Sequence, residues 1–213
     1  MPRVAVLVAS AVAATVVIVV GGVLALDDGD DPTPPETEDS FATTPLSDVD
    51  TAGVSVVRGP FCDAIDDRQV DAVLGAVPDV VEWRNGDELD LAGGRRDVVH
   101  EFGCSYAVQD VGSARAWVFA PPVHAARAAR LVKMAQAGTG CQAAPGPVFG
   151  SPTVGLTCTN KRGTIRASYR GLFGDAWLVC EVELPTGSAD SADIADVAGR
   201  WCVGVLELSL IHI

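Results

Sequence analysis

The sequence predicts an α+β fold with an N-terminal transmembrane helix, followed by an antiparallel sheet of about five or six strands with helices on one face and three disulfides. Three observations lead to this prediction. Apolar residues fill the N-terminal segment, strand-like runs follow one another further along the chain, and all six cysteines lie beyond the apolar segment. Neighbouring strand-like runs favour an antiparallel sheet from which the helices are segregated.

The first element is the apolar segment 1–26. From Val4 to Leu26 it contains no charged residue, and this length can cross a hydrocarbon core of about 30 Å as a helix. A cleaved secretory signal is the alternative, but its apolar region is usually about 7–15 residues long. We therefore expect an uncleaved signal-anchor. Arg3 precedes the span and four aspartates follow it, which predicts a cytoplasmic N-terminus and an extracytoplasmic remainder in a single-pass protein of the cell membrane.

The second element is an acidic linker, residues 27–58, rich in Pro and Thr. Nine acidic residues stand there against the single basic residue Arg58, in a chain whose net charge is −13. Such a composition cannot bury enough apolar surface to fold, and it predicts an extended spacer. The acidic exterior also argues against nucleic acid as a partner.

The third element is a domain spanning residues 59–207. An acidic start and Gly75 as a stop predict a first short helix over 67–75, and Pro121-Pro122 predicts the start of a second at 123, which ends at Gly138. Alternation predicts the strands: 80–89, 100–109, 114–120, 153–160, 163–171 and 176–184. Helical spacing returns over 192–208. Residues 208–213 abandon it, and they resemble either a translated sequencing adapter, which would make the tail non-native, or an ordinary apolar extension.

The cysteines predict a disulfide framework, since an even number in an extracytoplasmic domain is typical of one. Three lie on the more apolar faces of predicted strands and three lie at helix starts, ends or flanks. Pairing each strand cysteine with a helix-side cysteine, and favouring proximity in sequence, predicts Cys62–Cys104, Cys141–Cys158 and Cys180–Cys202. Each bridge should hold a helical segment against the sheet. No close pair of the C-x-x-C type occurs, so we expect no metal site and no cofactor.

The combined pattern resembles exported envelope proteins of actinobacteria. The shared features are the anchor, the acidic Pro/Thr linker, a Cys opening the first short helix, the strand with Cys104-Ser-Tyr106, and the segment from Arg170 to Cys180. The resemblance implies a membrane-anchored, disulfide-bonded α+β domain and carries no activity with it. This chain departs from the lipoprotein members because it lacks a cysteine at the end of its apolar segment.

Three groups of residues are candidates for function. The first is a row of residues at steps of three on the second predicted helix: His124, Arg127, Arg130 and Lys133. This row could receive an anionic ligand, and a solvated helix face is the alternative. The second is the set of four tryptophans, which could line a sugar-binding surface. Trp117 and Trp177 fall on the strand faces opposite the apolar runs, where they could be exposed, whereas ordinary aromatic packing is the alternative and the default. The third is the pair Glu181 and Glu183, which point away from the core.

No motif for a catalytic nucleophile, a phosphate loop or a zinc protease is present in the sequence. The function we expect is a non-catalytic envelope module that is anchored in the membrane and binds an extracytoplasmic ligand, either an envelope polymer or an envelope protein. The alternative is an envelope hydrolase that uses an acidic pair such as Glu181 and Glu183, because glycoside hydrolysis needs two carboxylates at a controlled separation.

Overall fold

The computed structural model describes residues 43–144, 146–161 and 163–209, all within one folded unit that comprises residues 41–213. The predicted transmembrane segment 1–26 lies outside the described residues, and so does the linker up to residue 42. Within the described part of the chain, no helix is both long enough and apolar enough to cross a membrane.

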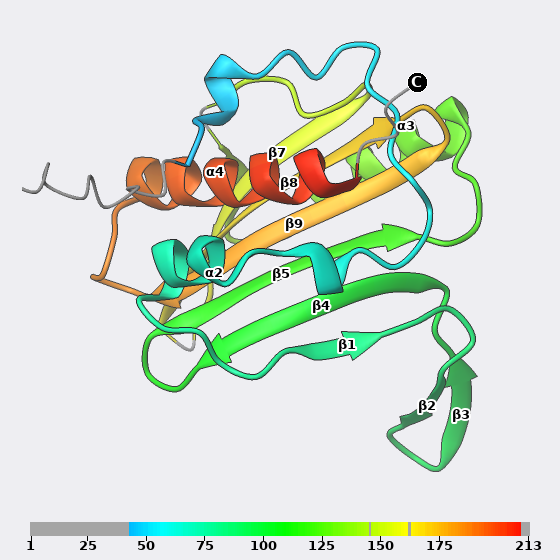
Figure 1. Ribbon diagram of the computed structural model, residues 1–213, viewed down its shortest axis with the longest axis horizontal. Helices are drawn as coiled ribbons and strands as arrows, with labels where there is room; N and C mark the ends of the chain where they lie inside the picture. Colours follow the sequence, from blue (N-terminus) through cyan, green and yellow to red (C-terminus); the bar gives the residue numbers. More distant parts are fainter. Residues whose placement is uncertain (1–42, 145, 162, 210–213) are drawn as a thin grey trace, which may run out of the picture. The chain divides into compact units, whose positions relative to one another are not determined.

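The fold is α+β and is built on a seven-stranded antiparallel sheet, one or two strands wider than the sequence predicted, in the order β1-β4-β5-β9-β8-β7-β6. Its strands are β1 (Val81–Trp83), β4 (Glu101–Val108), β5 (Gly112–Phe119), β6 (Cys141–Ala143), β7 (Thr153–Thr159), β8 (Thr164–Phe173) and β9 (Ala176–Pro185). The long strands β4, β5, β9 and β8 form its centre (Figure 1).

The helices cover both faces of the sheet, so the prediction that they lie on one face is wrong. Helices α2 (Asp67–Leu74) and α4 (Ser191–Ser209) pack on one side, whereas α3 (Ala125–Gln136) packs on the other (Figure 1). The physical reason lies in β9, which is apolar on both faces. Leu178 and Cys180 belong to the core beneath α4, while Trp177 and Val179 belong to a second core beneath α3. A strand of this kind needs a cover on each side.

Local signals explain where the helices begin and end. The Asp66 carboxylate accepts a 2.8 Å hydrogen bond from the backbone N–H of Arg68 at the start of α2, and Gly75 ends that helix in the left-handed conformation with φ = 64°. At the start of α4 the Asp190 carboxylate accepts from the N–H groups of Ala192 and Asp193. These caps partner N–H groups that the first helical turn leaves free.

The C-terminal part of the predicted linker is folded onto the domain. Residues 43–58 include the short 3-10 helix η1 (Leu46–Asp48), and they bury Leu46 and Val56 in the core beneath α4. This differs from the predicted extended spacer, which ran to residue 58. The apolar residues among the acids provide enough buried surface to hold this part of the linker in place.

The three predicted disulfides are confirmed: Cys62–Cys104, Cys141–Cys158 and Cys180–Cys202. The first ties the 3-10 helix η2 (Cys62–Ala64) to β4, and the third ties β9 to α4. The second joins two strands rather than a helix and the sheet. Cys141 and Cys158 lie opposite each other in the β6–β7 pair with their Cα atoms 4.0 Å apart, because the chain leaving α3 enters β6 at Cys141.

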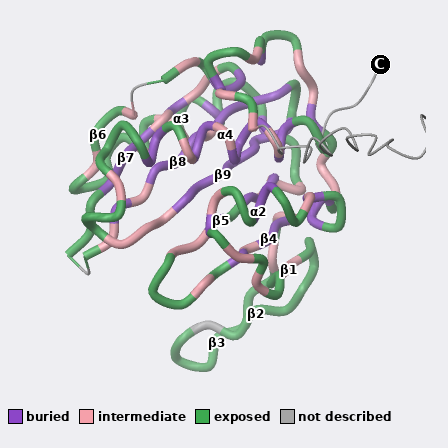
Figure 2. The backbone as a smooth tube through the Cα atoms, turned by 60° about the vertical axis from the view of Figure 1, so that its left-hand side comes forward, coloured by how far each residue is buried: buried purple, intermediate pink, exposed green. Residues whose placement is uncertain are grey.

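The hairpin of β2 (Glu88–Leu91) and β3 (Arg95–Val98) forms a separate two-stranded sheet. It is exposed along almost its whole length (Figure 2). Neither β3 nor β6 was predicted, because Arg95–Val98 lacks alternation and Cys141–Ala143 is very short. The Gly93-Gly94 pair, with both φ angles positive, was the one signal that could have identified the β2–β3 turn.

Candidate functional site

The predicted basic row on α3 does not converge on one surface. Its four members are all exposed: His124, Arg127, Arg130 and Lys133. Ala128 points into the core beneath the helix, and at about 100° per residue Arg130 points almost directly away from the sheet. Arg127 has an aromatic neighbour, with its guanidinium carbon 5.9 Å from the centre of the Phe119 ring.

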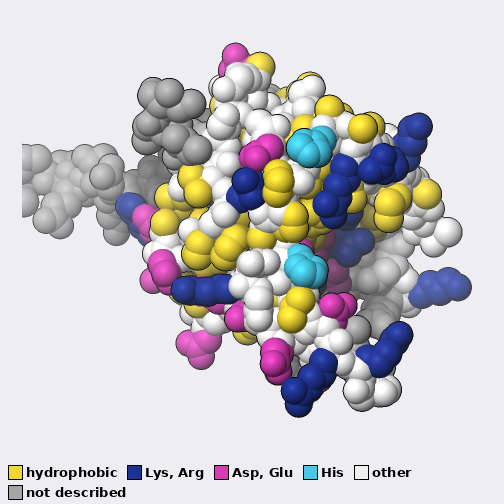
Figure 3. Space-filling model, turned by 90° about the vertical axis from the view of Figure 1, so that its right-hand side faces the viewer, with side chains coloured by type: hydrophobic (Ala, Val, Ile, Leu, Met, Phe, Trp, Pro, Cys, Tyr) yellow, Lys and Arg dark blue, Asp and Glu magenta, His cyan; other side chains and the backbone are white. Residues whose placement is uncertain are grey.

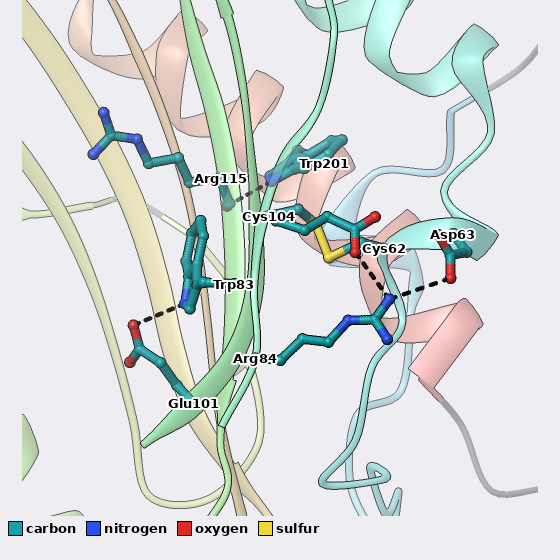
Figure 4. The surroundings of a disulfide bond; sticks show 9 residues. Cys62, Asp63, Trp83, Arg84, Glu101, Cys104, Arg115 and Trp201 are labelled. Atoms are coloured by element: carbon teal, nitrogen blue, oxygen red, sulfur yellow. Dashed lines mark hydrogen bonds and ion pairs between the residues drawn. A yellow bond between two sulfur atoms is a disulfide. The ribbon is translucent and has the colours of Figure 1, made fainter. Parts of the chain in front are cut away.

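The tryptophans divide between the two faces of the sheet. Trp177 and Trp201 are buried, at 2% and 0% exposure. Trp177 is therefore packed in the core beneath α3 and is not part of an exposed sugar-binding surface. Trp83 and Trp117 are half-buried on the α3 side of β1 and β5. Figure 4 shows Trp83 and Arg115 on one side of β4 and β5, with the Cys62–Cys104 bridge and Trp201 on the other.

The strand register gathers charged residues in the middle of the α3 side of the sheet. Arg115 on β5 lies directly opposite Glu181 on β9, and Glu181 lies directly opposite Ser168 on β8. Arg166 and Arg170 flank Ser168 at alternate positions of β8, so they point to the same side. We call Arg115, Arg166 and Arg170 the arginine cluster. Glu181 lies at its centre.

The Glu181 carboxylate lies between two arginines of this cluster. It is only 5% exposed, and each of its carboxylate oxygens faces a different strand. Oε1 lies 3.8 Å from Nη1 of Arg115, and Oε2 lies 3.8 Å from Nη1 of Arg166. A buried carboxylate requires such positive partners. Because 3.8 Å is too long for a hydrogen bond, the two arginines neutralise Glu181 without committing their N–H groups to it.

Several polar atoms of this region have no hydrogen-bond partner among the described residues. Three of them lie on the α3 side of β8: Nε of Arg166, Oγ of Ser168 and Nε of Arg170. Burial lowers the pKa of the Arg170 guanidinium, with a further lowering by Arg166 that Glu181 opposes. A guanidinium remains charged in proteins. The cluster therefore holds buried donors and a positive charge that the protein itself satisfies incompletely.

The surface next to the arginine cluster is open. Helix α3 covers β7, the adjoining parts of β8 and β9, and the Phe119 end of β5. Its hydrophobic contacts do not include β4 or the Ser113 end of β5. Small side chains form the floor there: Ser105, Ala107 and Ser113. A hollow of about 380 Å³ opens at the end of these strands, lined in part by Ser113, Thr164 and Glu183. Figure 3 shows basic side chains gathered on the side of the molecule that carries α3, next to a hollowed part of the surface.

Trp83 borders this surface at the sheet edge. Its ring lies against β4 over Gly103, where a Cβ atom would come within 2.5 Å of the ring carbon Cζ2. Its indole nitrogen donates a 3.1 Å hydrogen bond to Oε1 of Glu101, whose pKa is raised by burial. The missing side chain at position 103 thus lets the indole lie flat, and the hydrogen bond sets its orientation.

Glu181 and Glu183 occupy alternate positions on one strand, not opposite walls of a cleft. Glu181 is enclosed by Arg115 and Arg166, and Oε1 of Glu183 accepts a 2.8 Å hydrogen bond from the Thr164 hydroxyl. Among the described residues, no group of three or more His, Cys, Asp or Glu side chains could hold a metal ion.

A second hollow, of about 220 Å³, lies between α2 and α4 on the other side of the sheet, and three of its polar side chains have partners. Gln69 donates to the carbonyl of Trp201, Asp66 pairs with Arg68, and Arg200 pairs with Asp196. The arginine cluster is therefore the stronger candidate site, although the sequence did not predict it.

The chain matches no protein-family model, and comparisons with curated proteins and with solved structures likewise give no match.

Proposed function

We propose that this domain is a non-catalytic extracytoplasmic module that binds an anionic ligand at the arginine cluster, and that residues 1–26 anchor it in the cell membrane. The observation that supports binding is the buried Glu181, which lies 3.8 Å from a guanidinium nitrogen of Arg115 and of Arg166, next to an Nε of Arg166 that has no hydrogen-bond partner among the described residues. Charge-assisted hydrogen bonds to an incoming oxyanion would satisfy these donors. The three disulfides support an oxidising, extracytoplasmic location.

The arrangement favours binding over hydrolysis. Glycoside hydrolysis requires two carboxylates on either side of the scissile bond, whereas Glu181 lies beneath two guanidiniums and shares a strand with Glu183.

The experiment is a titration of the full-length protein, in a neutral detergent at low ionic strength, with a linear polyphosphate and with polygalacturonate. We expect at least one polymer to bind, and the variant Arg115→Gln/Arg166→Gln to bind it about tenfold or more weakly, because each charge-assisted hydrogen bond contributes about 1.5–3 kcal/mol. Binding should weaken further as salt is added.

The matched control replaces the exposed helix residues, as Arg127→Gln/Arg130→Gln/Lys133→Gln, and should change the affinity less than about threefold because exposed charges contribute little. Equal binding by the cluster variant and the wild type, or no binding of either polymer, would contradict the proposal. A larger loss in the helix variant would transfer the site to α3.

A further inference from the structure

The open face continues beyond the arginine cluster to an aromatic surface. Trp83 on β1 pairs with Gly103 on β4, and Gly103 pairs with Trp117 on β5, one alternate position from Arg115. From β1 to β8 the sheet crosses four strand spacings, which is about 19 Å. This distance is too long for a single small anion, and it matches an extended ligand.

The two ends of the open face, at Trp83 and at the arginine cluster, have different chemistry. At one end, the outer side of the Trp83 ring is left partly exposed because its inner side lies on Gly103. At the other end, Arg115 and Arg166 present charged donors above Glu181. The face of an aromatic ring carries partial negative charge, so it attracts the C–H groups on the face of a sugar ring. Guanidiniums, in turn, bind carboxylates.

Small side chains leave room for a chain of rings along this face. Ser105 lies next to Arg115 on the Trp83 side of the sheet, and Ala107 and Ser113 continue the row of small residues level with Arg166. The hydrogen bond from Trp83 to Glu101 fixes the orientation of the indole against the strand. The ring is therefore already in place before a ligand binds. Preorganisation of this kind reduces the entropy lost on binding.

We infer that the ligand of the open face is an acidic polysaccharide, with a sugar ring stacked on Trp83 and its carboxylates held by Arg115 and Arg166. This inference rests on the proposed function, since it assigns a ligand class to the same site. Trp83 distinguishes this inference from the proposed function, because a polyanion without sugar rings needs the arginines but not the indole.

The test compares three polymers on the full-length protein in neutral detergent: polygalacturonate, linear polyphosphate and neutral dextran. The variants are Trp83→Ala and Trp83→Phe, with Val98→Ala as the control, since Val98 lies on the separate β2–β3 hairpin and is 43% exposed. Circular dichroism of each variant reports whether the sheet is retained.

We expect wild-type protein to bind polygalacturonate more tightly than polyphosphate and to bind dextran at least tenfold more weakly. Trp83→Ala should weaken polygalacturonate binding about tenfold and change polyphosphate binding less than threefold. Trp83→Phe and Val98→Ala should retain most of the affinity. Unchanged polygalacturonate binding in Trp83→Ala, or an equal loss for both polyanions, would overturn the acidic-glycan inference and leave the anion-binding proposal standing. Equal binding of dextran and polygalacturonate would also overturn it.

Discussion

The Cys62–Cys104 disulfide holds η2, at the entrance to α2, against the centre of the sheet (Figure 4). Its cysteines are 42 residues apart, and closing a loop of that length lowers the entropy of the unfolded chain enough to stabilise the fold by about 4 kcal/mol. We expect Cys62→Ala/Cys104→Ala to lower the free energy of unfolding by about that amount and the melting temperature by about 10 °C. Urea denaturation of the full-length protein, followed by tryptophan fluorescence, measures the change.

The matched control is Cys141→Ala/Cys158→Ala. That bridge spans 17 residues, for which the same relation gives about 3 kcal/mol. Cys104 is fully buried, whereas Cys141 is half-exposed at the sheet edge, so loss of packing adds to the difference. An equal or larger loss of stability in the control would refute the reasoning, because neither the loop length nor the burial could then be the cause.

Two further predictions concern pH and helix capping. Burial, together with the nearby carboxylates of Glu82, Asp67 and Asp63, raises the pKa of Tyr106 to about 12. The folded state therefore favours the neutral phenol. This contributes about 2–3 kcal/mol of stability below pH 10, which is lost as the pH rises towards 12. Denaturation at stepwise alkaline pH should show this loss in the wild type and a smaller one in Tyr106→Phe, and identical profiles would contradict it. The pKa of Asp190 is lowered by its hydrogen bonds to the N–H groups of Asp193 and Ala192, so its contribution is present above pH 4 and is lost as pH falls further. Asp190→Asn should keep the cap and weaken this acid dependence, while Asp190→Ala should destabilise at neutral pH; equal stability of Asp190→Ala and the wild type would exclude the cap.

Features set by local chemistry could be predicted from the sequence. The bounds of α2 follow from Asp66 at its start and Gly75 at its end, and both signals lie within the helix's own neighbourhood. Alternation likewise predicted that Cys180 and Glu181 point to opposite sides of β9, and the proximity of cysteines predicted the three pairings.

Features set by strand order could not be predicted in this way. Arg115 meets Glu181 only because β5 pairs with β9, and Ser168 meets it only because β8 lies on the other side. These neighbours are far apart in sequence, so no local pattern brings them together. The position of α3 could not be predicted for the same reason. Both faces of β9 carry apolar residues, so only the complete fold decides which helix covers which face.

The most direct test of a binding site at the arginine cluster is nuclear magnetic resonance of the protein during titration with short oligogalacturonates. Side-chain Nε–H signals report on arginines and indole N–H signals report on tryptophans, so each candidate residue has its own probe. We expect shifts at Arg115, Arg166 and Trp83, with little change at Arg130 on the outer side of α3. Shifts confined to α3, or none at Arg115 and Arg166 when the oligomer binds, would contradict it.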